Sequence, residues 1–453
     1  MENLDFLYQK YSAVFIQQEK SKDTLVYQNR RQAFLKSLDF PVLFAGVPVE
    51  PGLNEEFAST WTKLIQDPAF LYLTGINQTD CFLLLDPKAK NEILFLPKKD
   101  KEKEFWTGVK LGISESETEE AKIITGFSAI EDSDSFFTFT EKYFKENNLK
   151  KIGVYYSEFY KQDSNAKFVQ EIQNIAQKQN IQVESIAKMF LEKRLVLDTF
   201  RLKKAEEAIK NTGNAFEKML SQIKNFSTER DVSLFLNYEM LKNTDSDLAF
   251  PTIAASGKNA CCLHYTKNDE PLKKDSLVLL DFGVRSGTLC SDISRTFPVS
   301  GKFNPLQKKI YQIVLDAQKF HEAQVKPGKT LNELDKNVWN FINKRLDVLK
   351  REGLEIELLY ESRPHGVSHF IGEHVHEGAY LGRLLNKTLE PGMLISNEPG
   401  VYGHFSGNIG GIFYDEWIGI RVEDDLLVTE NGCKNLSVQI PKTIEAIENL
   451  MRV

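Results

Sequence analysis

The fold of this chain is decided by the stretch LVLLDFGVRSGTLCSDISRTF, which occupies residues 277–297 of 453. Residues 277–285 are typical of a β-strand, and residues 288–297 are typical of a strand that returns beside it. Ser286-Gly287 between them predicts a two-residue turn of the kind that joins antiparallel strands. The stretch therefore predicts a β-hairpin.

Two aspartates face each other in this predicted hairpin. The turn sets Arg285 against Thr288, and counting back four residues on each strand sets Asp281 against Asp292. Directly opposed side chains hold their Cβ atoms about 4.5–5.5 Å apart, where two carboxylates repel each other. One alternative is a pair of exposed acids on an edge strand. The apolar residues around each aspartate favour the other alternative, which is a cation held between them.

Glu398 and Glu423 also follow predicted strands. Glu398 comes after residues 393–397, and Glu423 ends the strand at residues 418–422. Period-two alternation puts Arg421 and Glu423 on the same face of that strand. A salt bridge with Arg421 explains Glu423 equally well, so neither glutamate taken alone indicates a functional site.

The histidines of the chain are few and clustered. There are seven, none of them lies in the first 263 residues, and four lie within twelve positions. One cluster can arise by chance, but this clustering favours a chemical role. The seven are His264, His321, His365, His369, His374, His376 and His404. We expect His374 and His404 at the surface or outside the layer of direct ligands.

His365 and His369 are four residues apart, a spacing that gives a metal-binding pair on a helix. The glycines within residues 366–372 disfavour a helix, so we predict an extended strand or loop. That conformation also keeps both histidines on one face. His376 lies an odd number of residues beyond His369 and needs a bend in the chain to join the same site.

These residues together predict a metal site. Two aspartates, two glutamates and one histidine make a hard, oxygen-rich set of ligands, which suits manganese better than a structural zinc. Zinc, cobalt and iron also bind such ligands. Four carboxylates exceed the needs of one divalent ion, so we predict two metals bridged by oxygen.

The composition argues against several other classes of protein. Hydrophobic residues make up 42% and charged residues 27% of the chain, which is typical of a folded protein of two or three domains. A net charge of −7 argues against a nucleic-acid binder that neutralises phosphates. No apolar run approaches the roughly 18 residues of a membrane span. Five cysteines without CxxC spacing, and no secretory signal pattern, predict a cytoplasmic location.

The first part of the chain is predicted to be an α/β domain, in which strands alternate with helical segments such as residues 166–178. The predicted strands are residues 40–46, 70–75, 81–87, 92–97 and 151–156. A boundary is expected near residues 185–200, where Asp198 can cap a long helix. We therefore predict domains of residues 1–190 and 191–453.

The motifs of both parts resemble the metallo-aminopeptidase family that includes aminopeptidase P and prolidase. The resemblance covers most of the chain and implies an α/β (α+β) protein, with an N-terminal creatinase-like α/β domain followed by a C-terminal pita-bread metallopeptidase domain. The segments that carry it are residues 257–266, 280–283, 291–299, 365–369, 397–402 and 419–424 in the second part, and residues 67–75 and 94–112 in the first.

The resemblance implies which residues hold the metals. Asp292 and Glu423 are implied to bridge two divalent ions, Asp281 to hold one of them, and His369 and Glu398 to hold the other. A hydroxide shared by the two ions is implied to attack the carbonyl that precedes a proline. Glu398 is implied to act as the proton shuttle.

The resemblance also implies residues on the substrate side of the site. His264, His365 and His376 are implied to orient the peptide and to stabilise the oxyanion of the tetrahedral intermediate. Arg421 is implied to orient Glu423, or the site as a whole, without touching the substrate.

The implied reaction is release of the N-terminal residue from peptides with proline at the second position. Ser368, where prolidases tend to have glycine, and residues 104–108 favour aminopeptidase P over a prolidase that cleaves Xaa-Pro dipeptides. Some relatives keep this fold as creatine-hydrolysing enzymes or as histone-binding modules. The presence of all five ligand positions favours a peptidase. The family also implies a homo-oligomer, a dimer or a tetramer.

Overall fold

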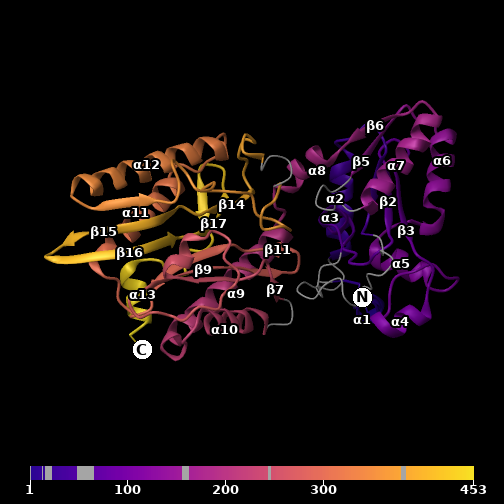
Figure 1. Cartoon of the computed structure of the whole chain (residues 1–453). Helices are drawn as coiled ribbons and strands as arrows, with labels where there is room; N and C mark the ends of the chain where they lie inside the picture. Colours follow the sequence, from indigo (N-terminus) through magenta and orange to yellow (C-terminus); the bar gives the residue numbers. More distant parts are fainter. Residues whose placement is uncertain are drawn as a thin grey trace. The chain divides into compact units, whose positions relative to one another are not determined.

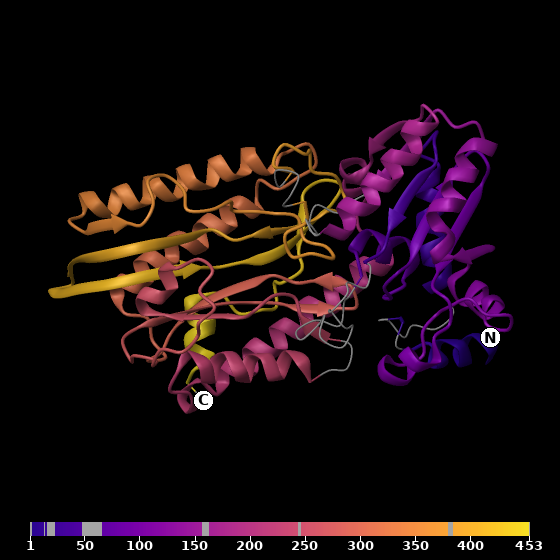
Figure 2. The same cartoon turned by 45° about the vertical axis from the view of Figure 1, so that its right-hand side comes forward.

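The computed structural model describes residues 2–12, 14–15, 23–47, 66–155, 163–242, 246–378 and 384–452. The chain divides into two compact units, Met1–Arg194 and Leu195–Val453. Figures 1 and 2 show both units from two directions. Each unit has hydrophobic clusters of its own.

The first unit is built around a six-stranded mixed sheet with the strand order β4-β3-β2-β1-β5-β6. Its strands are β1 Val42–Ala45, β2 Phe82–Asp86, β3 Asn91–Leu96, β4 Ala129–Asp132, β5 Lys151–Tyr155 and β6 Gln182–Ser185. Its helices are α1 Glu2–Lys10, α2 Asp23–Leu35, α3 Pro68–Thr74, α4 Lys101–Thr107, α5 Thr118–Thr125, α6 Phe136–Glu146, α7 Asp163–Lys178 and α8 Ala187–Arg194, with a 3₁₀ turn at Ser133–Ser135.

Helices cover both faces of this sheet because its central strands are apolar on both sides. Leu43 of β1 packs in one cluster with Phe136 of α6 and Phe168 of α7. Phe44, the next residue of β1, packs in the other cluster with Phe190 of α8, at 5.3 Å between ring centroids. Successive side chains of a strand point to opposite faces. The structure therefore confirms the predicted α/β fold of the first part.

The predicted strand at residues 70–75 is wrong, because this segment forms α3. Asp67 caps the helix by accepting hydrogen bonds from the backbone N–H groups of its first turn, and Pro68 occupies that turn. Gly75 ends the helix in the left-handed conformation, with φ at +73°. Most of the helix is buried, so the run is apolar all round and its periodicity carries no sign of a helix. The edge strands β4 and β6 are short and largely polar and were not predicted.

The second unit places helices on both sides of small three-stranded sheets. Its strands are β7 Ser246–Leu248, β8 Ile253–Ser256, β9 Leu277–Phe282, β10 Val284–Ser286, β11 Leu289–Cys290, β12 Ile293–Pro298, β13 Glu355–Leu358, β14 Leu394–Asn397, β15 Gly400–Ile409, β16 Ile412–Arg421, β17 Asp424–Val428 and β18 Cys433–Asn435. Its helices are α9 Thr199–Ser221, α10 Glu229–Leu241, α11 Pro305–Glu322, α12 Leu331–Arg351 and α13 Ile444–Leu450, with 3₁₀ turns at Ile223–Asn225 and Gly257–Cys261.

The layers of this unit are visible in Figures 1 and 2. Helices α11 and α12 pack together on one side of the strands, and α9 and α10 lie on the other side. The hairpin of β15 and β16 runs between these layers and extends beyond them. Asp198 caps α9, as the sequence predicts, by accepting a hydrogen bond from the backbone N–H of Arg201.

Residues 277–297 form a hairpin, but its register differs from the predicted one. The turn falls one residue later, on Gly287-Thr288, with Gly287 at a left-handed φ of +57°. Asp281 therefore lies opposite Ser294 and not opposite Asp292. The predicted register is wrong by two residues. Because side chains alternate with a period of two, a shift of two keeps both aspartates on the same face.

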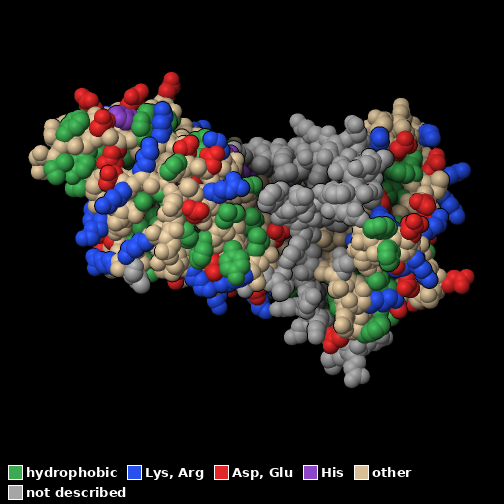
Figure 3. Space-filling model, turned by 60° about the horizontal axis from the view of Figure 1, so that its bottom comes forward, with side chains coloured by type: hydrophobic (Ala, Val, Ile, Leu, Met, Phe, Trp, Pro, Cys, Tyr) green, Lys and Arg blue, Asp and Glu red, His purple; other side chains and the backbone are tan. Residues whose placement is uncertain are grey.

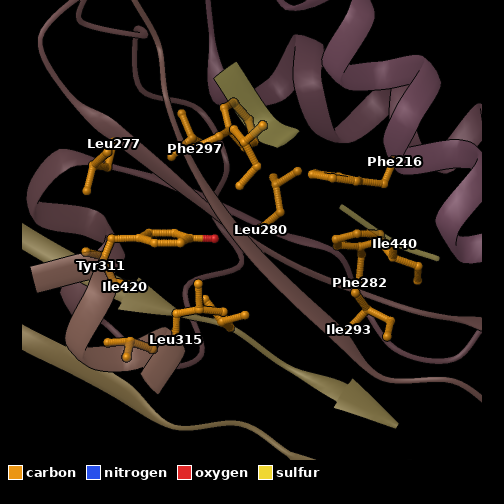
Figure 4. Close-up of a cluster of buried hydrophobic side chains, with 14 of the residues drawn as sticks. Phe216, Leu277, Leu280, Phe282, Ile293, Phe297, Tyr311, Leu315, Ile420 and Ile440 are labelled. Atoms are coloured by element: carbon orange, nitrogen blue, oxygen red, sulfur yellow. The ribbon is translucent and has the colours of Figure 1, made fainter. Parts of the chain in front are cut away.

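The hydrophobic core holds these strands in place (Figure 4). Phe216 of α9 stacks on Phe282 of β9, with ring centroids 5.7 Å apart. Tyr311 of α11 is fully buried, and its hydroxyl donates to the carbonyl oxygen of Lys442 at 2.7 Å. This close packing fixes β9 and β12, and with them Asp281 in β9 and Asp292 directly before β12.

The outer surface carries charged side chains of both signs, as expected for a chain with 27% charged residues. On the face shown in Figure 3, Lys and Arg side chains are interspersed with Asp and Glu side chains. Among the described residues, none of the helices combines the length with the apolar character that a bilayer-spanning segment requires.

Candidate metal centre

A cavity of about 240 Å³ lies in the second unit, where β9, β14 and β16 end. All nine site residues predicted from the sequence line it. They are His264, Asp281, Asp292, His365, His369, His376, Glu398, Arg421 and Glu423. The lining is completed by Leu263, Pro364, Gly366, Ser368 and Glu377.

Three carboxylates converge on one side of this cavity. Asp281 is the penultimate residue of β9, Asp292 directly precedes β12, and Glu423 lies between β16 and β17. One oxygen from each lies within 4.8 Å of the other two. Like charges at this separation repel strongly unless protons or cations neutralise them.

His369 joins two further groups of potential ligands. One contains Glu398 and Glu423, and the other contains Asp292 and His376. Nε2 of His369 lies 3.3 Å from an oxygen of Asp292 and 3.3 Å from Oε1 of Glu398. The three groups share members, so all five residues predicted as metal ligands surround a common space, with His376 beside them.

Burial and mutual repulsion raise the pKa of two of these acids. Burial raises the pKa of Asp292 well above its usual range, and the charges of Glu423 and Asp281 raise it further. Burial also raises the pKa of Glu423, with contributions from Glu398 and Asp281. A cation bound among these acids would offset the repulsion that raises both pKa values.

Two buried oxygens test whether a metal fits here. Oδ1 of Asp281 and Oε1 of Glu423 accept no hydrogen bond from any of the described residues. Buried acceptors without a donor are costly, and a cation would satisfy both. The surrounding ligands are carboxylate oxygens and imidazole nitrogens, which suit divalent metal ions. The residues present therefore fit a pair of divalent metals.

Arg421 is the buried positive charge beside the acids. Its Nη2 lies 2.7 Å from Oδ2 of Asp281. Its Nε donates to the hydroxyl of Ser294 at 2.8 Å, and that hydroxyl donates to Glu423 at 2.7 Å. Arg421 thus holds Asp281 directly and Glu423 through Ser294. Such outer contacts orient metal ligands.

Tyr402 connects Arg421 to His365 and was missed by the sequence reasoning. Its hydroxyl accepts a hydrogen bond from Nη1 of Arg421 at 3.1 Å and lies 3.0 Å from Nε2 of His365. Burial raises the pKa of Tyr402 to about 12, so it is a neutral phenol at pH 7. Its even spacing from Glu398 in an extended segment is the signal that could have found it.

Residues 364–372 form no helix, as predicted, and follow an irregular path with isolated β-bridges at Phe370. His365 and His369 both reach one carboxylate, that of Glu398. Nδ1 of His365 lies 3.7 Å from Oε2, and Nε2 of His369 lies 3.3 Å from Oε1. The two histidines therefore lie on the same side of their segment, as the sequence predicts.

Ser368 fixes this segment to the elements behind it. Its hydroxyl donates to the carbonyl oxygen of Ser396 on β14 at 2.6 Å and lies 3.0 Å from Nε2 of His321 on α11. Burial lowers the pKa of His321 to about 4, so its ring is neutral at pH 7. The backbone N–H of His369 donates to the hydroxyl of Ser396 at 3.0 Å.

The bend that His376 requires is present. Phe370 and Glu377 form a β-bridge, which closes the loop between them. The loop returns the ring of His376 to that of His369, with centroids 4.2 Å apart. His374, in the same loop, does not line the cavity, and His404 lies on β15 with Nε2 2.6 Å from Asp415.

A buried ion pair fixes the loop between Phe370 and Glu377 to helix α9. Nε and Nη2 of Arg201, in the first turn of α9, donate to the two carboxylate oxygens of Glu373 at 2.8 and 2.6 Å. Each side chain is only 1% exposed. Paired bonds of this kind are the strongest that arginine makes with a carboxylate.

Comparison with known proteins identifies the family. A model of metallopeptidase family M24 matches residues 203–430, half of the chain. The chain belongs to metallopeptidase family M24. A model of the aminopeptidase P N-terminal domain matches residues 27–152. This pair of matches places the M24 chain in the aminopeptidase P group.

Individual relatives of this M24 chain agree. The Xaa-Pro aminopeptidase of Haemophilus influenzae is 30% identical over 394 residues, which cover 85% of this chain and 88% of the relative. The Xaa-Pro aminopeptidase of Escherichia coli is 28% identical over 444 residues, which cover 94% and 97%. The structure of aminopeptidase P from E. coli with the inhibitor Pro-Leu superposes with a TM-score of 0.76 at 25% identity, covering 94% of this chain and 98% of that one.

These matches confirm the family and the fold predicted from the sequence. The M24 chain has an N-terminal aminopeptidase P domain followed by a pita-bread catalytic domain. M24 peptidases depend on metal, and the acid and histidine cluster is the candidate metal site of this member.

Proposed function

We propose that this M24 chain is an Xaa-Pro aminopeptidase, which hydrolyses the bond between the first residue of a peptide and a proline at the second position. The observation that carries the proposal is the overlap of three potential ligand groups in one cavity. The names of the two relatives support the same class of substrate.

In this proposal the five ligands hold two divalent ions, with manganese as the preferred metal because the site is rich in oxygen. Asp292 and Glu423 would bridge the two ions, Asp281 would hold one, and His369 and Glu398 would hold the other. When bound, such a pair would lower the pKa of a water molecule and polarise the peptide carbonyl.

The other residues of the cavity bind the peptide and move protons. Oε1 of Glu398 faces His369, and Oε2 faces His365. We assign the proton transfer to Oε2, which carries a proton to the leaving proline nitrogen. His264, His365 and His376 line the same cavity and are assigned to orient the peptide and to donate to its carbonyl oxygen.

Arg421 has a different part in the proposal, because its contacts are with Asp281, Ser294 and Tyr402. Its bond with Oδ2 of Asp281 keeps that carboxylate aimed at the cavity. Tyr402 connects Arg421 to His365, because its hydroxyl lies within hydrogen-bond distance of both side chains.

The experiment that tests the function compares three substrates. The purified chain with added Mn²⁺ is expected to cleave an Xaa-Pro-Xaa tripeptide with kcat/KM at least about tenfold above that for the Xaa-Pro dipeptide. The matched control is the tripeptide with alanine in place of proline, which is expected to be a poor substrate. Faster cleavage of the dipeptide would make the chain a prolidase. No cleavage and no bound metal would make it a binding protein.

The proposal includes a cytoplasmic homo-oligomer, a dimer or a tetramer, which acts on free peptides. The free cysteines support a location in the reducing cytoplasm. All five lie among the described residues, and none forms a disulfide. Light scattering on the purified chain measures the oligomer directly.

A further inference from the structure

Glu229 is a buried acidic residue in the second unit. It is the first residue of α10 and is completely buried, with no exposed surface. A buried carboxylate is costly unless hydrogen bonds replace its lost water. The N-terminus of a helix also favours a negative charge, so position and partners must be considered together.

Five donors surround this carboxylate. Oε1 accepts from the backbone N–H of Ser256 at 2.7 Å, from the Ser256 hydroxyl at 2.8 Å and from Nδ2 of Asn259 at 3.0 Å. Oε2 accepts from the hydroxyl of Tyr265 at 2.8 Å and from the backbone N–H of Glu270 at 3.0 Å. Two of these five donors belong to Ser256, the last residue of β8, and the other three belong to the connection between β8 and β9.

The first part of that connection, residues 257–270, is called the His264 loop here because it carries His264 into the cavity together with Leu263. Its far end is tied to the start of α10, where the backbone N–H of Glu229 donates to the carbonyl oxygen of Glu270 at 2.9 Å. Its middle is tied by Tyr265, the residue directly after His264. The carboxylate of Glu229 thus lies at the centre of the loop.

The loop lies directly on β16, the strand that ends at Arg421. A Cβ atom at Gly419 would lie 2.2 Å from the carbonyl oxygen of Ala260, so only glycine allows this approach. Nζ of Lys258 lies 4.5 Å from the ring centroid of Trp417. Glu229 from one side and β16 from the other therefore fix the path of the His264 loop.

We propose that Glu229 is a positioning residue, which determines where His264 stands in the cavity by holding the loop around it. It acts through Tyr265, Asn259 and the loop backbone, and it touches neither the cavity nor a metal ligand. The inference rests on the proposed peptide-orienting role of His264.

Glu229→Gln tests the proposal with little change of shape. The amide of glutamine has one acceptor oxygen and one NH2 group, so the N–H and O–H donors that face the NH2 group lose their acceptor. We expect kcat/KM for an Xaa-Pro-Xaa tripeptide to fall by about 10–100-fold, the scale of a misplaced catalytic group. In a His264→Ala background, the same substitution is expected to change kcat/KM less than about threefold, since coupled residues are not additive.

Asp231→Asn is the matched control. Asp231 lies in the same helical turn and accepts from the backbone N–H groups of Ser227 and Thr228, but it is exposed and does not contact the His264 loop. The Asp231→Asn variant is expected to leave kcat/KM unchanged. Tyr265→Phe, which removes one donor, takes the place of Glu229→Gln if that variant does not fold.

A second measurement does not depend on activity. Hydrogen exchange of the amides in residues 257–270 is expected to rise in Glu229→Gln and Tyr265→Phe and to stay unchanged in Asp231→Asn. Equal fold-changes in both backgrounds, or unchanged exchange in the loop, would overturn the inference. A wild-type chain that cleaves no Xaa-Pro-Xaa peptide would contradict the proposed function instead, and the exchange result would then decide the inference alone.

Discussion

Asp292→Ala is expected to abolish the metal-dependent cleavage of Xaa-Pro-Xaa peptides. Asp292 belongs to two of the three groups of potential ligands, so its loss weakens both proposed metal positions. The fall in kcat/KM is expected to exceed by far the roughly 100-fold loss that follows removal of an outer partner of a metal site. Steady-state kinetics with added Mn²⁺ measures it.

The isosteric variant Asp292→Asn separates chemistry from misfolding. Burial and the neighbouring acids raise the pKa of Asp292, so its ionised form destabilises the metal-free fold. The metal-free asparagine variant is therefore expected to unfold at or above the wild-type temperature while being inactive. Asp415→Asn, on the exposed part of β16 and away from the cavity, is expected to retain activity. Wild-type activity in Asp292→Ala would remove the proposed mechanism.

Glu373→Leu is expected to destabilise the catalytic unit strongly. It leaves the guanidinium of Arg201 buried without its bidentate partner, which costs roughly 3–5 kcal/mol. For a unit of this size that loss corresponds to a fall in the melting temperature of roughly 6–20 °C. Differential scanning calorimetry of the metal-free chain measures the transition.

The double variant Arg201→Leu, Glu373→Leu is expected to regain most of this stability, because replacing both partners of a buried pair by apolar residues is often neutral. Glu207→Gln is the control on the same helix. The Glu207 side chain is 38% exposed, so its pair with Lys204 should contribute less than about 1 kcal/mol. A double variant no more stable than Glu373→Leu would contradict this account of the pair.

Much of the candidate site was predictable because its residues are chemically unusual for their surroundings. Asp281 lies in the apolar strand β9 and Asp292 directly precedes β12, and His365 and His369 lie in a chain poor in histidine. The predicted register placed the two aspartates wrongly, because a glycine such as Gly287 accepts either position of a two-residue turn. The error was of two residues, so it preserved the face and with it the prediction of a shared site.

The fold was predicted less well where local signals conflict. The segment at residues 70–75 is apolar enough for a buried strand, and its helical state follows only from the caps at Asp67 and Gly75. A helix that is buried on most sides loses the periodic pattern that distinguishes it from a strand.

The residues that support the site could not be found from the sequence. His264, His365 and His376 each lie in a loop held by a buried acid. In the first loop the Tyr265 hydroxyl donates to Glu229, and in the third Arg201 donates to Glu373. In the second loop the backbone N–H of Val367 donates to Oδ1 of Asp335, on α12, at 2.9 Å. Each acid and its partner are far apart in the chain, by 172 residues for the pair of Arg201 and Glu373. The sequence around a single acid in a helix or loop does not reveal its partner, because only folding brings the two residues together.

The central claim is that five side chains from distant parts of the chain enclose a pair of divalent ions. The measurement that tests it most directly is anomalous diffraction at the manganese absorption edge, from crystals grown with excess Mn²⁺. The account predicts two peaks in the cavity, both in contact with Asp292 and Glu423, with Asp281 on one peak and His369 and Glu398 on the other. A cavity without a peak, whose five side chains point apart, would contradict it.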